Sequence, residues 1–193
     1  MSILIHQPYY ISLSTIIPAI NGISFYSAVE RTFDDMYKHG ERFDVIYGHF
    51  WECGLLAAKI GKNYCIPAFV ANGESEISIS RIKRNVQYSK YISGVISVSG
   101  KSKDETIRKG LSTEDKIIVL PNAVDSTLFH PINKDLARDE LGFSHELFII
   151  SFVGGFIERK GSNRVAQALD QLDDVYSFFI GKGESVPKCK NIL

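Results

Sequence analysis

The chain has 193 residues, of which 45% are hydrophobic, and its 12 Phe and 9 Tyr supply ample material for a folded core. Lys and Arg together number 22, and Asp and Glu also number 22, so no overall charge would draw the chain to nucleic acid. The 3 cysteines include no Cys-x-x-Cys pair, and no apolar run approaches the roughly 20 residues that span a bilayer, which predicts a soluble cytoplasmic protein without a disulfide framework.

The apolar pattern predicts strands that alternate with helices along the first part of the chain. Strands are expected over residues 2–6, 43–47, 66–71, 94–99 and 116–120. Helices are expected over residues 21–39, 52–60, 77–91 and 103–109. This alternation is typical of an α/β protein with a mostly parallel, Rossmann-like, doubly wound sheet.

A polar stretch between Pro121 and Pro131 interrupts the alternation and leads into a short helix expected over residues 135–141. Few contacts are expected to cross such a stretch, which makes it the best domain boundary. The sequence therefore predicts a first domain over residues 1–121, a linker over residues 122–146 and the beginning of a second α/β domain over residues 147–193.

The second domain begins with an apolar strand over residues 147–153, which is expected to be buried on both faces. Gly154 and Gly155 end this strand, and Ser162 or Asn163 can cap the helix that follows. The apolar stripe expected on that helix comprises Val165, Ala168, Leu169 and Leu172, and a further strand is expected over residues 175–180.

Arg159 and Lys160 lie on the loop between this first strand and its helix. A crossover of this kind brings its loop to the carboxyl end of the sheet, where α/β proteins bind ligands. The amino terminus of the helix beside the loop also favours anions. The loop therefore predicts a phosphate-bearing ligand.

Polar side chains also follow two strands of the first domain. His49 and Asn72 each stand at the carboxyl end of an expected strand, and Glu74 and Glu76 come just beyond Asn72. The glutamates could act as acids or could accept hydrogen bonds from sugar hydroxyls, and a capping or turn role is equally open for each of these residues. The histidines of the chain show no metal-ligand spacing, so no metal site is predicted.

The expected helix over residues 77–91 carries several cations, namely Arg81, Lys83, Arg84 and Lys90. Such a helix could contact anionic lipid or a lipid-phosphate acceptor as a peripheral membrane element at the inner face of the membrane. A solvated helix face is the alternative. The run Gly100-Lys101-Ser102 lacks the earlier glycine that a nucleotide-triphosphate loop requires.

Three segments resemble group 1 glycosyltransferases, in the same order and at similar separations. Residues 43–50 read FDVIYGHF, residues 120–131 read LPNAVDSTLFHP and residues 152–161 read FVGGFIERKG. The usual patterns of that family are FDVIHAHF, PNGVDxxxFxP and FVGRLxxRKG. The resemblance extends over residues 43–183.

This resemblance implies the GT-B fold, in which two Rossmann-like domains flank a cleft that holds a sugar nucleotide, without a metal ion or other cofactor. It implies transfer of the sugar, with retention of configuration, to a glycan or lipid-linked acceptor, as in polysaccharide or glycolipid biosynthesis. Lys160 matches the lysine that holds the donor phosphate. The site residues that follow are Lys160 and Asn72 for catalysis, and Gly154, Gly155, Arg159, His49 and Glu74 for substrate binding.

The sequence departs from the family pattern at three positions. Gly155 stands where the family has a phosphate-binding arginine, for which Arg159 could substitute. Asn72 stands where the family often has a histidine near the reacting sugar, and Ala123 replaces a glycine. The family's first strand with its glycine-rich loop and its distal pair of glutamates have no counterpart here, so a fragment truncated at both ends is expected. A catalytically inactive remnant or binding module and a sugar-nucleotide epimerase of the same fold are the alternatives.

Overall fold

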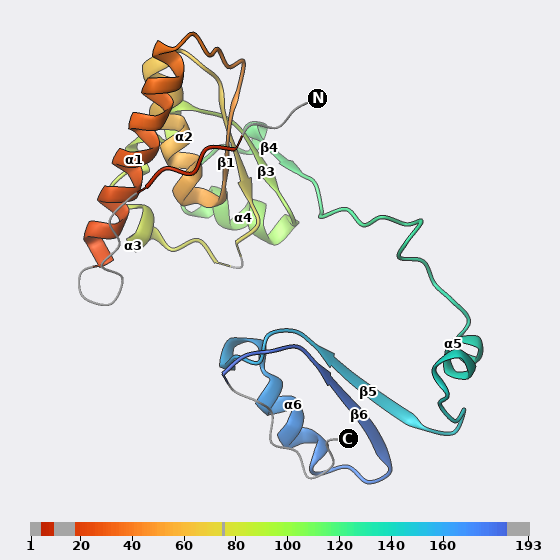
Figure 1. Ribbon diagram of the computed structural model, residues 1–193. Coiled ribbons are helices and arrows are strands. Elements are labelled where there is room, and N and C mark those ends of the chain that lie inside the picture. The colour runs from red at the N-terminus through yellow and green to blue at the C-terminus, as the bar shows by residue number, and fades with distance from the viewer. Residues whose placement is uncertain (1–4, 10–17, 75, 185–193) are drawn as a thin grey trace. The chain divides into compact units, whose positions relative to one another are not determined.

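The computed structural model describes residues 5–9, 18–74 and 76–184. The chain forms two compact units, unit 1 over Met1–Ala123 and unit 2 over Val124–Leu193 (Figure 1). Within the described ranges, no helix is both long enough and apolar enough to cross a membrane.

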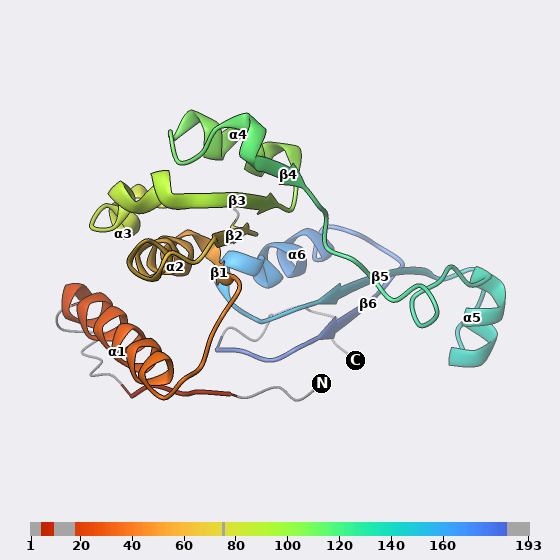
Figure 2. The same ribbon diagram turned by 90° about the horizontal axis from the view of Figure 1, so that it is seen from above.

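Unit 1 is built around a parallel sheet. Its strands are β1 (Ile46–His49), β2 (Ala68–Asn72), β3 (Ile92–Ser97) and β4 (Ile117–Val119), and they follow one another across the sheet in chain order (Figure 2). Its helices are α1 (Pro18–Lys38), α2 (Phe50–Tyr64), α3 (Ile79–Ile82) and α4 (Gly100–Arg108), with 3-10 turns at Val86–Tyr91 (η1) and Glu114–Lys116 (η2). The α/β class with a parallel sheet that the sequence predicted is therefore confirmed.

The core of unit 1 lies between the sheet and α2, which packs against β1 and β2. Trp51 and Leu55 of α2 are fully buried there, together with Val70 of β2 and Val95 of β3. A smaller cluster joins Tyr26 of α1 to the other side of α2. Burial of these large apolar side chains is the main stabilising contribution to the unit.

The sequence predicted a strand over residues 43–47 and a helix over residues 52–60, with a loop over residues 48–51 between them. The structure has no such loop between β1 and α2. The helix begins at Phe50, directly after the strand, and Phe50 has a positive φ of 64°. A Cβ on Gly48 would lie 2.4 Å from the Cα of Gly54, and one on Gly54 would lie 2.5 Å from Cγ2 of Val70. The two glycines therefore let the strand and the helix touch backbone to backbone.

We expect Gly48→Ala to destabilise unit 1 by about 1 to 3 kcal/mol, because the added methyl group meets backbone atoms that cannot move aside. Gly100→Ala is the matched control, since nothing lies within 4 Å of a Cβ at that position, and it should change stability by less than about 0.5 kcal/mol. Urea denaturation of both variants measures the difference. Equal midpoints would show that the close approach at Gly48 is not required.

The segment over residues 77–91 is not the single helix that the sequence predicted. The short helix α3 is followed by η1, and Asn85 separates them with φ −112° and ψ 2°. Asn85 is buried, so the chain turns inward at this point and the helical period is lost. The expected basic helix is therefore wrong, although Arg81, Lys83, Arg84 and Lys90 are all exposed.

At the amino terminus, residues 2–4 of the expected first strand lie outside the described residues. Ile5 and His6 have no regular structure. The other strands of unit 1 differ from expectation by one to three residues at their ends, which is where a hydrophobic pattern is least informative.

Unit 2 contains α5 (Lys134–Leu141), β5 (Phe148–Val153), the 3-10 turn η3 (Glu158–Lys160), α6 (Ser162–Leu169) and β6 (Val175–Ile180). The strands β5 and β6 pair in parallel from Phe148↔Val175 to Val153↔Ile180. Arg138 of α5 is buried and donates to three backbone carbonyls after the helix, those of Ser144, His145 and Leu147, each at 2.6 Å.

Two expectations for unit 2 need correction. The helix α6 ends at Leu169, so Leu172 lies beyond it and is 49% exposed, whereas Ala166 is the buried side chain of its apolar face. The strand β5 is not covered on both faces by the described residues, since Phe148 is 62% exposed and Val153 is 72% exposed. Its only described partner in the sheet is β6.

Candidate functional site

A cavity of about 460 Å³ opens at the carboxyl ends of the strands of unit 1. The residues that line it come from the ends of β1, β2 and β3 and from the segments after all four strands: Tyr47, His49, Phe50, Ala71, Gly73, Ile96, Val98, Leu120, Pro121, Asn122 and Ala123. This edge of a parallel sheet is where α/β proteins bind ligands. A volume of this size is that of a small-molecule site.

Aromatic side chains form one wall of this cavity. His49 ends β1, and its ring centroid lies 4.2 Å from that of Phe50. Tyr47 is 54% exposed and Phe50 is 40% exposed, so the faces of both rings are accessible from the cavity. The wall therefore offers an imidazole for hydrogen bonding and flat apolar faces for packing.

Glu74 stabilises the start of α2, the helix that carries part of this wall. Its Oε2 accepts a hydrogen bond of 3.2 Å from the backbone N–H of Trp51, in the first turn of α2. Burial raises the pKa of the Glu74 carboxyl, and this hydrogen bond offsets part of the rise. Glu74 thus caps α2 from another element, which is one of the two roles that the sequence left open.

Asn72 is fully buried at the end of β2. Its amide donates to Oγ1 of Thr106 at 3.0 Å, and its Oδ1 accepts from the backbone N–H of Glu74 at 3.4 Å. The Ser102 hydroxyl donates to the backbone carbonyl of Asn72 at 3.2 Å. The side chain of Asn72 therefore faces α4, whereas its neighbours Ala71 and Gly73 line the cavity.

The other predicted residues lie in unit 2, on the loop between β5 and α6. Arg159 and Lys160 are exposed on the turn η3. A Cβ on Gly155 would meet only the carbonyl oxygen of Lys182, at 3.9 Å, so the backbone there leaves room for a ligand or a larger side chain. Gly161 has φ 78°, a left-handed conformation that favours glycine between η3 and α6.

The structure therefore divides the predicted site residues between two regions. His49 and Glu74 flank the start of α2 in unit 1, and Arg159 and Lys160 share the loop with Gly154 and Gly155 in unit 2. The aromatic wall residues Tyr47 and Phe50 were missed as site residues, although both belong to the run FDVIYGHF. Among the residues that the structure describes, no cluster of side chains could hold a metal ion.

No protein-family model matches the chain. A curated relative, D-inositol 3-phosphate glycosyltransferase 1 of Catenulispora acidiphila, is 26% identical over 148 residues. The match covers 67% of this chain and 34% of the relative, so the chain spans about a third of that protein's length.

Solved structures of similar fold include HepE from Anabaena in complex with UDP, with a TM-score of 0.63 and 19% identity. That match covers 87% of this chain and 46% of HepE. Sucrose-phosphate synthase from Thermosynechococcus elongatus matches with a TM-score of 0.61 and 16% identity, over 88% of this chain and 43% of the synthase. These likenesses show the fold, and the curated relative adds a similarity in sequence. The chain is therefore related, in fold and in sequence, to the glycosyltransferases of the GT-B class.

Proposed function

We propose that this protein transfers a sugar from a sugar nucleotide to a hydroxyl group of a glycan or lipid-linked acceptor, with retention of configuration. The observation that carries the proposal is the loop between β5 and α6, where Arg159 and Lys160 are exposed directly before a helix amino terminus. The loop belongs to a strand–helix–strand unit in a chain related to glycosyltransferases. Fixed cations at such a place suit a diphosphate.

In the proposed reaction, the bond between the anomeric carbon and the diphosphate oxygen breaks. A new bond forms between that carbon and the acceptor oxygen, whose proton passes to the leaving diphosphate. Negative charge develops on the leaving diphosphate, and a cation placed there stabilises the transition state more than the ground state. Lys160 is the residue to which we assign this role, and Asn72 is assigned the positioning of β2 against α4.

The cavity of unit 1 is assigned to the acceptor. The ring nitrogens of His49 can hydrogen-bond a hydroxyl group, and the exposed faces of Tyr47 and Phe50 can pack on the apolar face of a sugar ring. Glu74 fixes the start of α2 and with it the direction of this wall.

The proposal is tested by measuring nucleotide release with and without acceptors. UDP-glucose is the first donor to try, since the HepE structures contain UDP, glucose and UDP-glucose. Acceptor-dependent release of UDP, with an α-linked product, supports a retaining transferase. Isomerisation of the donor without an acceptor would favour an epimerase, and donor binding without turnover would favour a binding module.

Arg159→Ala should weaken UDP-glucose binding about tenfold, because Arg159 supplies the second cation that Gly155 cannot. Lys134→Ala is the control, since Lys134 is an exposed cation of the same unit at the start of α5. Calorimetric titration of both variants measures the change. Unaltered affinity in Arg159→Ala would remove this residue from the donor site.

We also propose that the protein contacts the inner face of the membrane through its exposed cations near α3 and η1. Lys62 and Lys90 lie 5.0 and 5.3 Å from the ring centroid of Tyr91, and Lys83 and Arg84 are exposed in the turn between α3 and η1. Each such cation contributes about 1 kcal/mol at an anionic surface. The double variant Lys83→Ala/Arg84→Ala should therefore bind phosphatidylserine vesicles at least about tenfold more weakly than the wild type in co-sedimentation. If the wild type bound zwitterionic vesicles as well as it binds phosphatidylserine vesicles, the proposal would be contradicted.

A further inference from the structure

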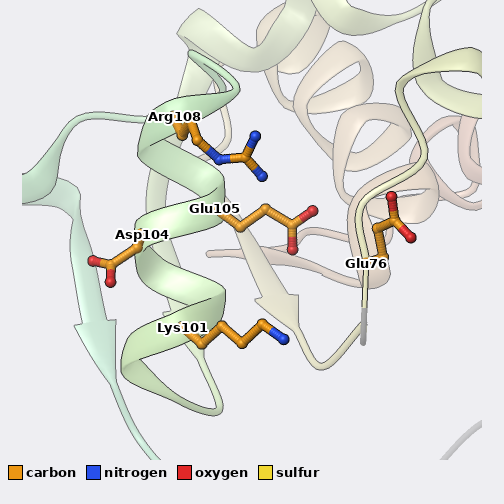
Figure 3. A pocket seen from close by; sticks show the side chains of 5 residues that line it. All are labelled: Glu76, Lys101, Asp104, Glu105 and Arg108. Atoms are coloured by element: carbon orange, nitrogen blue, oxygen red, sulfur yellow. The ribbon is translucent and has the colours of Figure 1, made fainter.

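A second cavity of unit 1, of about 430 Å³, lies outside the sites assigned above. It is lined by charged side chains of α4 and of the segment after β2: Glu76, Lys101, Asp104, Glu105 and Arg108 (Figure 3). Because an apolar ligand would gain nothing from such a lining, the cavity suits a polar, charged molecule.

Three of these side chains share one face of α4. Lys101, Glu105 and Arg108 are spaced by four and three residues, so they lie above one another along the helix. Figure 3 shows all three projecting from the same side of α4, with Glu76 on the facing segment and Asp104 on the opposite flank of the helix. The two cations thus stand on either side of one carboxylate.

That carboxylate is already neutralised by groups that are not part of the lining. Glu105 Oε1 lies 2.7 Å from Nζ of Lys109 and accepts a hydrogen bond of 3.0 Å from the backbone N–H of Ile77. Lys109 also donates to the carbonyl of Ile77. The hydrogen bond from Lys109 holds the pKa of Glu105 below its usual value, so Glu105 stays ionised and paired.

Lys101 and Arg108 are left without such a partner. Both are exposed, and the only described interaction of Arg108 is its charge acting on Glu105, which Lys109 already pairs. By contrast, Lys103 on the same helix is paired with Glu114 at 2.8 Å. The cavity therefore presents two exposed cations, with the carboxylate of Glu76 as an acceptor across from them.

We propose that this cavity binds a small phosphorylated sugar, whose phosphate contacts Lys101 and Arg108 and whose hydroxyls donate to Glu76. Guanidinium and ammonium groups are the usual partners of phosphate, and a carboxylate accepts strongly from hydroxyl groups. A bare phosphate would satisfy the cations and leave most of the cavity to water.

The proposal is tested on the 193-residue chain by calorimetric titration with glucose 6-phosphate, inorganic phosphate and glucose. Glucose 6-phosphate should bind at least about tenfold more tightly than inorganic phosphate, and glucose should bind more weakly still. Lys101→Ala and Arg108→Ala should each weaken glucose 6-phosphate binding about tenfold. Glu76→Gln should weaken glucose 6-phosphate binding and leave phosphate binding unchanged or stronger.

Lys103→Ala is the matched control, because it removes a cation from the same helix outside the cavity, and it should leave binding unchanged. All four side chains are on the surface or in an exposed pair, and thermal melting of each variant confirms that it is folded. Normal binding in both Lys101→Ala and Arg108→Ala would overturn the proposal, as would an equal loss in Lys103→Ala. The proposal would also be overturned if inorganic phosphate bound as tightly as glucose 6-phosphate.

UDP-glucose binding should be the same in all variants. If a variant lost UDP-glucose binding together with glucose 6-phosphate binding, the cavity would not be a site separate from the donor site.

Discussion

Lys160→Ala is expected to slow sugar transfer by roughly 30- to 1,000-fold, equivalent to about 2 to 4 kcal/mol of transition-state stabilisation. The lysine is exposed on η3, directly before Gly161 and α6, so its ammonium group is free to meet a ligand at that helix terminus. Because charge builds on the diphosphate only as the sugar departs, turnover should fall more than donor affinity.

Steady-state kinetics with UDP-glucose separate these two effects. Lys160→Arg keeps the positive charge and should retain part of the rate, and Lys134→Ala, which removes an exposed cation elsewhere in unit 2, should keep all of it. A Lys160→Ala enzyme with normal turnover would show that another group carries the developing charge.

Glu105→Gln is expected to destabilise unit 1 by about 2 to 4 kcal/mol at neutral pH. The side chains of Glu105 and Lys109 are only 10% and 16% exposed, and the substitution leaves the Lys109 ammonium group without its counter-charge in a poorly hydrated place. Glu114→Gln is the matched control, because it breaks a Lys–Glu contact of nearly the same length, 2.8 Å, in which Glu114 is 76% exposed. Surface pairs of that kind contribute little, so the control should unfold close to the wild-type midpoint.

The loss should also depend on pH. The folded-state pKa of Glu105 is lowered, so its contribution to stability is fully present above the unfolded value of about 4.3 and is lost as the pH falls through the folded value. The wild type should therefore lose its advantage over Glu105→Gln progressively as the pH falls below the unfolded value. Urea denaturation at a series of pH values from 7 downward measures this, and a constant difference would mean that the ion pair does not account for the loss.

Much of the fold could be predicted from the sequence where short-range patterns decide the outcome. The strand over residues 175–180 is correct to the residue, and the helix after Asn133 is one residue longer than expected, because Asn133 caps it and Gly142 ends it in a left-handed conformation. Such signals need only a few neighbouring residues. The start of α6 differs, since Gly161 takes the cap position with no side-chain cap and the predicted cap Ser162 is the first residue of the helix.

The features that the sequence could not predict lie where residues distant in the sequence decide the local structure. Asn72 was predicted as a site residue because it follows a strand, and the hydrogen bond from its amide to Thr106, 34 positions further on, could not be foreseen. Asn85 interrupts a helix by turning inward, and no local pattern predicts that it is buried. Phe50 begins α2 with a positive φ, at a junction where Gly48 lies against Gly54. Packing of this kind cannot be derived from periodicity.

The contact between β1 and α2 limits how the proposed acceptor cavity can vary. The strand ends at His49 and the helix starts at Phe50, so no residue there can absorb an insertion. One extra residue would rotate α2 by about 100° and move Trp51 out of the core. The aromatic wall can change in side-chain identity but not in length. Differences in acceptor size must therefore be accommodated by the opposite side of the cavity, where the chain after β4 runs through Leu120 and Pro121 without regular structure and can lengthen at little cost.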